Sequence, residues 1–373
     1  MRYGNFLPEG GTIGFLAPSY GCVIEPYASL FDSALSRFAK LGHKAVLGPN
    51  CRLDLAVGRS NRADLCGREL TESFLSRESD VLISCGGGEL MCEILPFVDW
   101  DALRKAPPKW YLGFSDNTNY TFLAATLLDT AAIYGPCAGS FGQEPWHPSL
   151  SDAYDLLRGR KLSFTGYPLF ELTKVKDEEH PLLPYNVTEK TEYRFFVQRP
   201  GFLPESEAAG AGSAPSRLVP SPAPEEGLAE TDHLSLSGRL LGGCIDCLEN
   251  LVGTQFDSVP AFAEDYAGDG ILWFLESCDL TPMSLRRSLW HMRMAGWFKN
   301  ASGFLFGRPY HYGEEMLGLD MTRAVTGALG DLGVPILFDA DFGHLPPAVP
   351  IVTGALAKVR ADREHFSITY TLS

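Results

Sequence analysis

The chain has 373 residues, of which 45% are hydrophobic and 21% are charged, a composition that excludes a wholly disordered, collagen-like or coiled-coil protein. Its formal charge of −15 disfavours a nucleic-acid partner, because binding to a polyanion depends on lysine and arginine. The length exceeds the size at which a single core stops growing, so we expect two domains.

The first part of the chain alternates predicted strands and helices. The strands are short apolar runs, and the helices carry apolar residues at helical spacing. The predicted strands are 12–17, 44–47, 80–84, 110–114 and 132–134, and the predicted helices are 30–41, 65–75 and 118–128. Strands joined through helices form a doubly wound parallel sheet, whose ligands bind at the carboxyl ends of the strands.

A low-complexity segment precedes the last third of the chain. Residues 205–230 are rich in Ala, Gly, Ser, Pro and Glu, which is typical of a flexible linker or insertion. Further alternation follows, with predicted strands at 270–275, 303–306 and 334–338 and predicted helices at 282–292 and 321–329. The sequence thus predicts an N-terminal α/β domain over 1–165, a connecting region over 166–235 and a C-terminal α/β domain over 236–373.

The sequence shows no sign of export or membrane insertion. No apolar run approaches the roughly 20 residues that cross a bilayer, and residues 1–11 lack the pattern of a signal peptide. We therefore expect a cytoplasmic protein with no membrane partner. The nine cysteines are scattered and odd in number, which favours reduced thiols. No HExxH or similar ligand spacing occurs, so we expect no metal.

Ser115 lies where the predicted strand 110–114 meets the predicted helix 118–128. On such a turn the hydroxyl is exposed at the sheet edge, and the amide of Asp116 belongs to a helix N-terminus with partial positive charge. This geometry suits a nucleophile with an oxyanion donor beside it. The motif departs from Gly-x-Ser-x-Gly, since Asn117 replaces the second glycine. A helix N-cap at Ser115 or Asp116 explains the same residues.

A glycine loop, Gly86, Gly87 and Gly88, follows the predicted strand 80–84. Its backbone amides can approach a ligand oxygen closely, as a phosphate cradle or an oxyanion hole requires. A tight structural turn is the alternative. The G-x-G-x-x-G fingerprint is absent, so a nucleotide-dependent oxidoreductase is disfavoured, and we expect no cofactor.

Glu276 ends the predicted strand 270–275, and His344 follows the predicted strand 334–338 after a turn. Singly, Glu276 has an ordinary explanation as an acid in a first helical turn, and His344 as a satisfied polar residue. Together with Ser115 they form the set that a catalytic triad needs: a carboxylate orients a histidine, which deprotonates a serine. The shared position at strand ends favours this joint interpretation.

Several short motifs occur in order from about residue 10 to about residue 360. They are TIGFLAPS at 12–19, GFSDNT at 113–118, YGP at 134–136, SFG at 140–142, GG at 242–243, LE at 275–276 and DFGH at 341–344. This set resembles the LD-carboxypeptidase family of serine peptidases, family S66, and the block 134–142 most resembles its microcin C self-immunity branch. The resemblance implies a flavodoxin-like N-terminal domain, a smaller α/β C-terminal domain and an active site in the cleft between them.

The resemblance also implies roles for individual residues. Ser115 becomes the nucleophile, His344 the general base and Glu276 its orienting partner. The amides of Gly87 and Asp116 form the oxyanion hole, and the neighbouring Gly86 and Gly88 contact the substrate.

The implied substrates are a murein-type small peptide or an aminoacyl-nucleotide, and the implied assembly is a homodimer. The microcin branch tends to carry a tryptophan that stacks on the nucleotide base. Here the central loop reads Pro184-Tyr185-Asn186, so stacking falls to Tyr185 or another aromatic residue.

Two other functions stay open on the sequence alone. One is a cysteine amidohydrolase that uses Cys85, beside the glycine loop, with His344. The other is a non-catalytic protein that binds a small peptide or acidic ligand between its domains.

Overall fold

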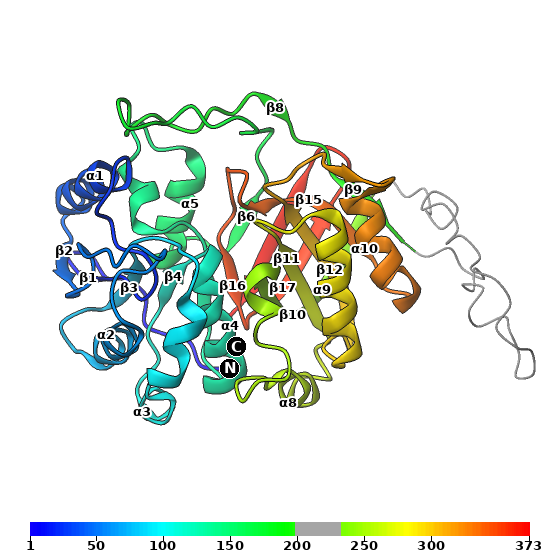
Figure 1. The fold of residues 1–373 in the computed structure, drawn as a ribbon, viewed down its shortest axis with the longest axis horizontal. Coiled ribbons are helices and arrows are strands. Elements are labelled where there is room, and N and C mark those ends of the chain that lie inside the picture. The colour runs from blue at the N-terminus through cyan, green and yellow to red at the C-terminus, as the bar shows by residue number, and fades with distance from the viewer. Residues whose placement is uncertain (198–232) are drawn as a thin grey trace, which may run out of the picture.

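The computed structural model describes residues 1–197 and 233–373, and the expected insertion at 205–230 lies outside the described residues. Within these ranges the chain is a two-domain α/β protein with two large β-sheets and helices packed around them (Figure 1). None of the helices in these ranges combines the length and apolar composition that a membrane crossing requires.

The first sheet is mainly parallel and has the strand order β2-β1-β3-β4-β5-β16. Its strands are β1 (Thr12–Leu16), β2 (Lys44–Leu47), β3 (Val81–Ser84), β4 (Tyr111–Gly113), β5 (Ala132–Tyr134) and β16 (Ile351–Thr353). Strands β1 to β5 are parallel, in the 2-1-3-4-5 order of flavodoxin-type sheets, as expected. Strand β16 comes from the last part of the chain and is antiparallel to β5.

Helices cover both faces of the first sheet, because its strands are apolar on both faces. Ile13 and Ile83 pack with α1 and α5 on one face, whereas Leu16 and Leu82 pack with α2, α3 and α4 on the other. Successive side chains of a strand point to opposite faces, which produces this division. The helices are α1 (Tyr27–Lys40), α2 (Ala63–Leu75), α3 (Trp100–Lys105), α4 (Thr118–Leu128) and α5 (Pro148–Leu157).

The second sheet is mixed, with the strand order β6-β18-β17-β10-β11-β12-β15-β9. Its strands are β6 (Ser163–Thr165), β9 (Arg194–Phe196), β10 (Leu234–Cys244), β11 (Ile271–Glu276), β12 (Ala301–Arg308), β15 (Ile336–Gly343), β17 (Leu356–Ala361) and β18 (Phe366–Thr371). Strands β10, β11, β12 and β15 are parallel, and antiparallel strands flank them on both sides. The alternation expected for this domain therefore holds only for its centre.

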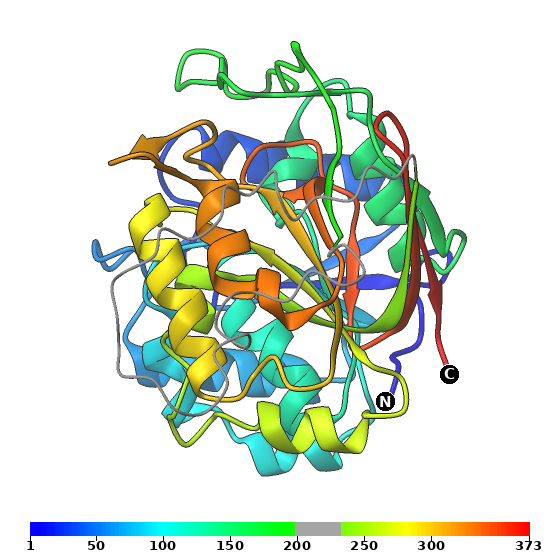
Figure 2. The ribbon, with the colours of Figure 1, turned by 90° about the vertical axis from the view of Figure 1, so that its right-hand side faces the viewer.

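One face of the second sheet is covered by helices and the other faces the first domain. Trp273 and Phe304 pack with the helices, whereas Leu272 and Leu305 belong to the cluster shared with the first domain. Figure 2 shows α9 and α10 on the outer face of this sheet. The helices are α7 (Ile245–Leu248), α8 (Val259–Asp265), α9 (Pro282–Met294) and α10 (Met321–Leu329). Short ladders also form, β7 (Leu169–Phe170) with β8 (Glu189–Lys190) and β13 (Glu315–Met316) with β14 (Leu319–Asp320).

Strand β15 is longer than the sequence led us to expect. The prediction ended a strand at 338 and placed a turn before His344, but β15 continues to Gly343. The register shifts against β12, and Asp339 has a left-handed φ of 62°. Asp339 and Asp341 gave this segment the composition of a turn, yet each pairs with an arginine inside the structure.

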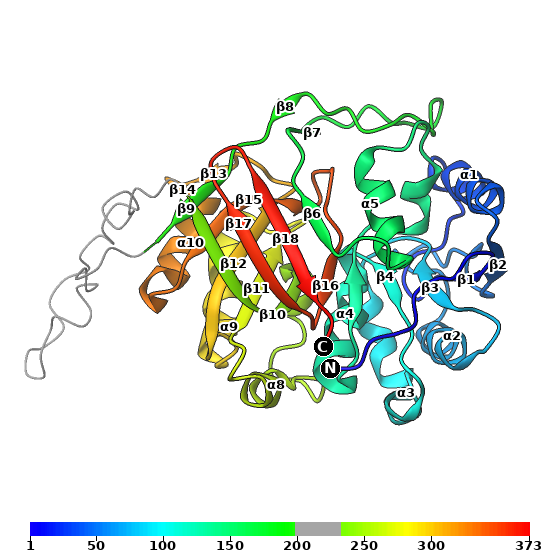
Figure 3. The same ribbon diagram turned by 180° about the vertical axis from the view of Figure 1, so that it is seen from behind.

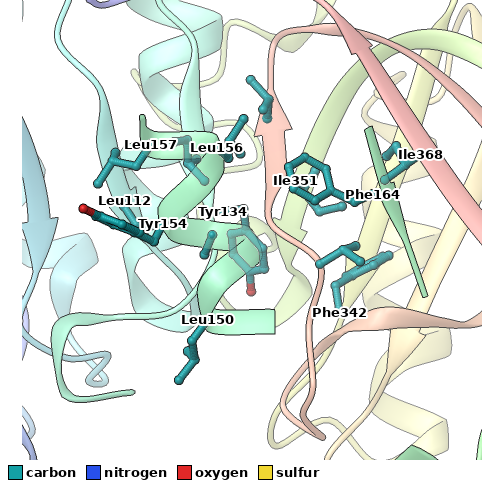
Figure 4. Packing of buried hydrophobic residues seen from close by; sticks show 14 of the residues in the cluster. Leu112, Tyr134, Leu150, Tyr154, Leu156, Leu157, Phe164, Phe342, Ile351 and Ile368 are labelled. Atoms are coloured by element: carbon teal, nitrogen blue, oxygen red, sulfur yellow. The ribbon is translucent and has the colours of Figure 1, made fainter. Parts of the chain in front are cut away.

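A continuous hydrophobic cluster joins the two sheets. Figure 4 shows Tyr134 of β5, Ile351 of β16, Phe342 of β15, Phe164 of β6 and Ile368 of β18 in this cluster. Strand β16 forms the edge of the first sheet, and β6 pairs with β18 at the edge of the second (Figure 3). The carboxyl ends of β4, β11 and β15 meet at this junction and carry the site described next.

Candidate active site

Ser115 lies on a tight turn between β4 and α4. Its φ of 61° is in the left-handed region, which a non-glycine residue rarely adopts and which marks local strain. The side-chain amide of Asn117 donates to the carbonyls of Phe114 (3.0 Å) and Gly86 (2.8 Å). Asn117 thus fastens the turn to the glycine loop, a task that the second glycine of Gly-x-Ser-x-Gly could not perform.

Three side chains from three strand ends form a hydrogen-bonded series. The Ser115 hydroxyl lies 2.9 Å from Nε2 of His344, and Nδ1 of His344 lies 2.6 Å from Oε2 of Glu276. Glu276 ends β11, is only 1% exposed and belongs to the second domain with His344, whereas Ser115 belongs to the first. A neutral imidazole with its proton on Nδ1 satisfies both bonds, which is the state that a general base needs.

The surroundings of His344 set its proton affinity. Burial lowers the pKa of His344, but the Glu276 carboxylate and the Cys278 thiol together raise it more, to well above the ordinary 6.5. Burial also raises the pKa of the Cys278 thiol, so this group stays protonated. The sequence analysis missed Cys278, whose position is fixed by Asp246 through the amides of Cys278 (3.0 Å) and Asp279 (2.8 Å).

The glycine loop lies directly against Ser115. A Cβ atom on Gly87 would be 3.3 Å from the Cβ of Ser115 and 3.4 Å from its Oγ. Gly88 has a φ of 148°, and a Cβ there would be 2.0 Å from the Ser19 hydroxyl. Only glycine fits at position 88, and the loop brings backbone groups within reach of an oxygen bound at Ser115.

The side chain of Asp116 is buried beneath the turn and anchors it. Its carboxylate accepts hydrogen bonds from the Ser19 hydroxyl, the Met91 amide (2.9 Å) and the Asn119 side chain (3.0 Å). Burial raises the pKa of this carboxyl. Because these bonds occupy the side chain, the backbone amide of Asp116 is the group that the expected oxyanion hole would use.

A cavity of about 620 Å³ opens beside Ser115 and His344. Both domains line it, and the segment 171–185 adds Lys174, Lys176 and Tyr185 to its wall. Neither lysine has a carboxylate oxygen within 4.0 Å among the described residues. Burial lowers the pKa of Lys176 to about 8. Among the described residues the two ammonium groups therefore make no ion pair, although the Glu171 carboxylate also lines the cavity and partly offsets the effect of burial on the pKa of Lys176.

Tyr185, expected as a stacking residue, lines the cavity but already has neighbours on its ring. The Lys176 ammonium lies 5.6 Å from the ring centre, and the His147 ring lies 5.8 Å away. A nucleotide base would have to displace one of these contacts to stack there.

Cys85, the alternative nucleophile, also lines the cavity. It is 2% exposed, and burial together with the neighbouring thiols of Cys22 and Cys51 raises its pKa well above the ordinary value. Among the described residues, His344 makes its side-chain hydrogen bonds to Ser115 and Glu276 and none to Cys85. The geometry favours the serine.

In the described part of the chain, the candidate metal ligands are Cys244, Glu276 and His344, whose ligand atoms lie within 4.8 Å of one another. Glu276 and Nδ1 of His344 already bond to each other. Hydrogen bonding to Cys247 and burial raise the pKa of the Cys244 thiol well above the ordinary value, which disfavours a thiolate ligand. This donor set suits proton transfer better than metal binding.

Models of two related domains match the chain. The LD-carboxypeptidase N-terminal domain matches residues 13–135 and the LD-carboxypeptidase C-terminal domain matches residues 237–359, together well over half of the sequence. The chain belongs to the LD-carboxypeptidase family. The resemblance inferred from the motifs is confirmed.

Curated relatives of this LD-carboxypeptidase family member are distant. The microcin C7 self-immunity protein MccF of Escherichia coli is 24% identical over 371 residues, covering 97% of this chain and 94% of that protein. A Streptomyces coelicolor protein, provisionally named a carboxypeptidase, is 25% identical over 300 residues, covering 79% of this chain and 73% of that protein.

Solved structures share the fold of this family member. An MccF-like protein from Bacillus anthracis has a TM-score of 0.77 at 19% identity over 100% of both chains. MccF in complex with glutamyl sulfamoyl guanosine has a TM-score of 0.74 at 19% identity, covering 99% of both chains.

Proposed function

We propose that the protein is a serine hydrolase that cleaves an amide bond at the end of a small anionic peptide. The observation that carries this proposal is the hydrogen-bonded series from Ser115 through His344 to Glu276. Membership of the LD-carboxypeptidase family supports it.

The proposed reaction has two steps with a covalent intermediate. The Ser115 oxygen attacks the amide carbonyl carbon while Nε2 of His344 takes the hydroxyl proton, and Glu276 stabilises the resulting imidazolium. The amides of Gly87 and Asp116 hold the oxyanion, each contributing about 3–4 kcal/mol in the transition state. The carbon–nitrogen bond then breaks, and His344 gives the proton to the leaving amine. Water, deprotonated by the same imidazole, releases the acyl group.

The charges of the cavity support an anionic substrate. Lys174 and Lys176 offer ammonium groups that a substrate carboxylate can neutralise. A murein tetrapeptide carries a carboxylate on its C-terminal residue, which is the residue that a carboxypeptidase removes. An aminoacyl-nucleotide is the second candidate, supported by the complex of MccF with glutamyl sulfamoyl guanosine. The occupied ring of Tyr185 favours the peptide.

The test is mass spectrometry of products after incubation with a murein tetrapeptide and, separately, an aminoacyl-sulfamoyl adenosine. We expect the wild type and Cys85→Ala to release the amine product, and Ser115→Ala to lower kcat by a factor on the order of 10⁴ or more. A fluorophosphonate should label Ser115. The Cys85→Ala variant isolates this thiol, whereas a thiol-alkylating reagent would also reach Cys278 in the cavity wall.

Hydrolysis retained by a verified Ser115→Ala protein would overturn the proposal. Loss of hydrolysis in Cys85→Ala, with the fold intact, would favour the cysteine amidohydrolase. Thermal stabilisation by either compound without product after long incubation would favour a binding protein.

A further inference from the structure

Tyr134, the last residue of β5, lies between the nucleophile turn and the carboxylate of the proposed triad. It is 2% exposed. Its hydroxyl lies 2.5 Å from Oε1 of Glu276 and 3.2 Å from the backbone nitrogen of Ser115. The Tyr134 hydroxyl therefore contacts both Ser115 and Glu276, and its bond to Glu276 joins the first domain to the second.

The direction of these hydrogen bonds follows from the groups involved. The amide of Ser115 only donates and the carboxylate of Glu276 only accepts, so the hydroxyl accepts from the first and donates to the second. Burial and the nearby Glu276 charge raise the pKa of Tyr134 well above its ordinary value, which keeps the donated proton in place.

We propose that Tyr134 is a positioning residue that locks the Ser115 turn and the Glu276 carboxylate into one array across the domain boundary. The proposal rests on the hydrolase function above and adds a residue to it. With Oε1 held by Tyr134, Oε2 stays directed at Nδ1 of His344. With its amide bonded to Tyr134, Ser115 keeps its left-handed backbone, and this amide is not free to serve as an oxyanion donor.

Loss of the hydroxyl has an electrostatic consequence at His344. The Tyr134 hydrogen bond draws negative charge from Glu276, so its removal leaves more charge on Oε2 and strengthens the attraction to the imidazolium. The pKa of His344 should therefore rise. The titratable groups around the imidazole are Glu276 and Cys278 from the end of β11, Cys244 from β10 and Glu89 from the glycine loop. Only the first contacts Tyr134 by a hydrogen bond.

The variant Tyr134→Phe tests this role, with Tyr120→Phe as the matched control. Phenylalanine keeps the ring contacts of Tyr134 with Phe114 and Phe274, at 6.2 and 5.6 Å between centres. Tyr120 is equally buried, and its hydroxyl has no hydrogen-bond partner among the described residues. The control therefore removes a buried hydroxyl without touching the array.

We expect Tyr134→Phe to lower kcat by roughly 10- to 100-fold with KM changed less than about threefold, and Tyr120→Phe to match the wild type. The acidic limb of the kcat/KM profile should move to higher pH in Tyr134→Phe. Titration of His344 by nitrogen NMR should show the same rise without any substrate. In a Glu276→Gln background the Tyr134→Phe change should no longer raise the pKa of His344, since that rise acts through the Glu276 carboxylate.

An unchanged His344 pKa in a folded Tyr134→Phe protein would overturn the proposal, whether or not the wild type hydrolyses either substrate. A rise in the His344 pKa that persists in the Glu276→Gln background would also contradict it, because the shift would then not act through the carboxylate. Absence of hydrolysis by the wild type, with the NMR shift present, would count against the hydrolase function and not against the array.

Discussion

At Ser115 the backbone sets the geometry on which the proposed chemistry depends. The residue has a φ of 61°, its amide bonds to Tyr134, and Asn117 ties the turn to the carbonyl of Gly86. Such a conformation persists only where neighbouring bonds hold it. A serine in an ordinary helical turn would direct its hydroxyl elsewhere, so the left-handed conformation is part of the site.

The pH dependence of activity should reflect the raised pKa of His344. The reaction needs the neutral imidazole, so kcat/KM should rise with pH as His344 loses its proton, and the midpoint should lie above 6.5 because the Glu276 charge favours the protonated form. Glu276→Gln removes that charge and should move the midpoint to lower pH while kcat falls. A profile from about pH 5 to 9 measures both. A midpoint below that of free histidine in the wild type would contradict the assignment.

The sequence predicted part of the site at this scale. Ser115, Glu276, His344 and the glycine loop were found because polar residues after buried strands of an α/β sheet gather at one edge. Tyr134 and Cys278 were not recognised as members of the site. Their contacts arise where two sheets meet, and no spacing along the chain records that meeting.

Among the elements, β15 places charged residues inside a sheet because they are paired there. The Arg308 guanidinium lies 2.8 Å from Asp341, and both side chains are at most 1% exposed. Asp341 also accepts from the Tyr167 amide (3.1 Å), and Arg308 donates to the carbonyl of Pro347 (3.1 Å). These bonds hold the segment after β15 that carries His344.

Removal of one partner of this pair should be costly. Arg308→Met leaves the Asp341 charge buried without its counter-ion, and we expect a loss of about 3–5 kcal/mol in the free energy of unfolding. Urea denaturation measures the loss. Arg104→Ala, which breaks an exposed pair with Asp101, is the matched control and should change stability little. Equal losses in the free energy of unfolding would show that the buried pair stabilises the fold no more than the exposed pair does.

The parallel elements were predictable and the antiparallel ones were not. Strands β1 to β5 are short apolar runs separated by helices with apolar faces, a pattern that specifies crossovers. The extension of β15 through Asp339 and Asp341 was missed because unpaired acids are typical of turns. Only the arginines of neighbouring strands make them compatible with a sheet.

For the whole molecule, the exchange of edge strands links the two domains. Strand β16, from the last part of the chain, completes the first sheet, and β6, which precedes residue 166, pairs within the second. The predicted domain 1–165 would thus lose β16 from its sheet, and the predicted domain 236–373 would lose β6. The hydrophobic cluster shown in Figure 4 continues across the same boundary.

We therefore expect both domains to unfold in one transition. Trp110 reports on the first domain, and Trp273 and Trp297 report on the second, all of them fully buried. One variant keeps Trp110 and another keeps Trp273 and Trp297, with the other tryptophans replaced. Their fluorescence curves in urea should coincide with each other and with far-UV circular dichroism. A fragment of residues 1–165 should not fold alone. Two separate transitions, or a folded fragment, would instead support independent domains.

The lowered pKa of Lys176 has a practical consequence for chemical labelling. Near pH 8 about half of its side chains carry a neutral, nucleophilic amine, whereas ordinary lysines remain ammonium ions. Lys109 shares the lowered pKa, but its nitrogen bonds to the carbonyls of Ser73 and Ser76. An activated ester at mildly alkaline pH should thus modify Lys176 ahead of other lysines. If the ester carries a fluorophore, the label at the cavity wall should report by its fluorescence when a ligand occupies the cavity.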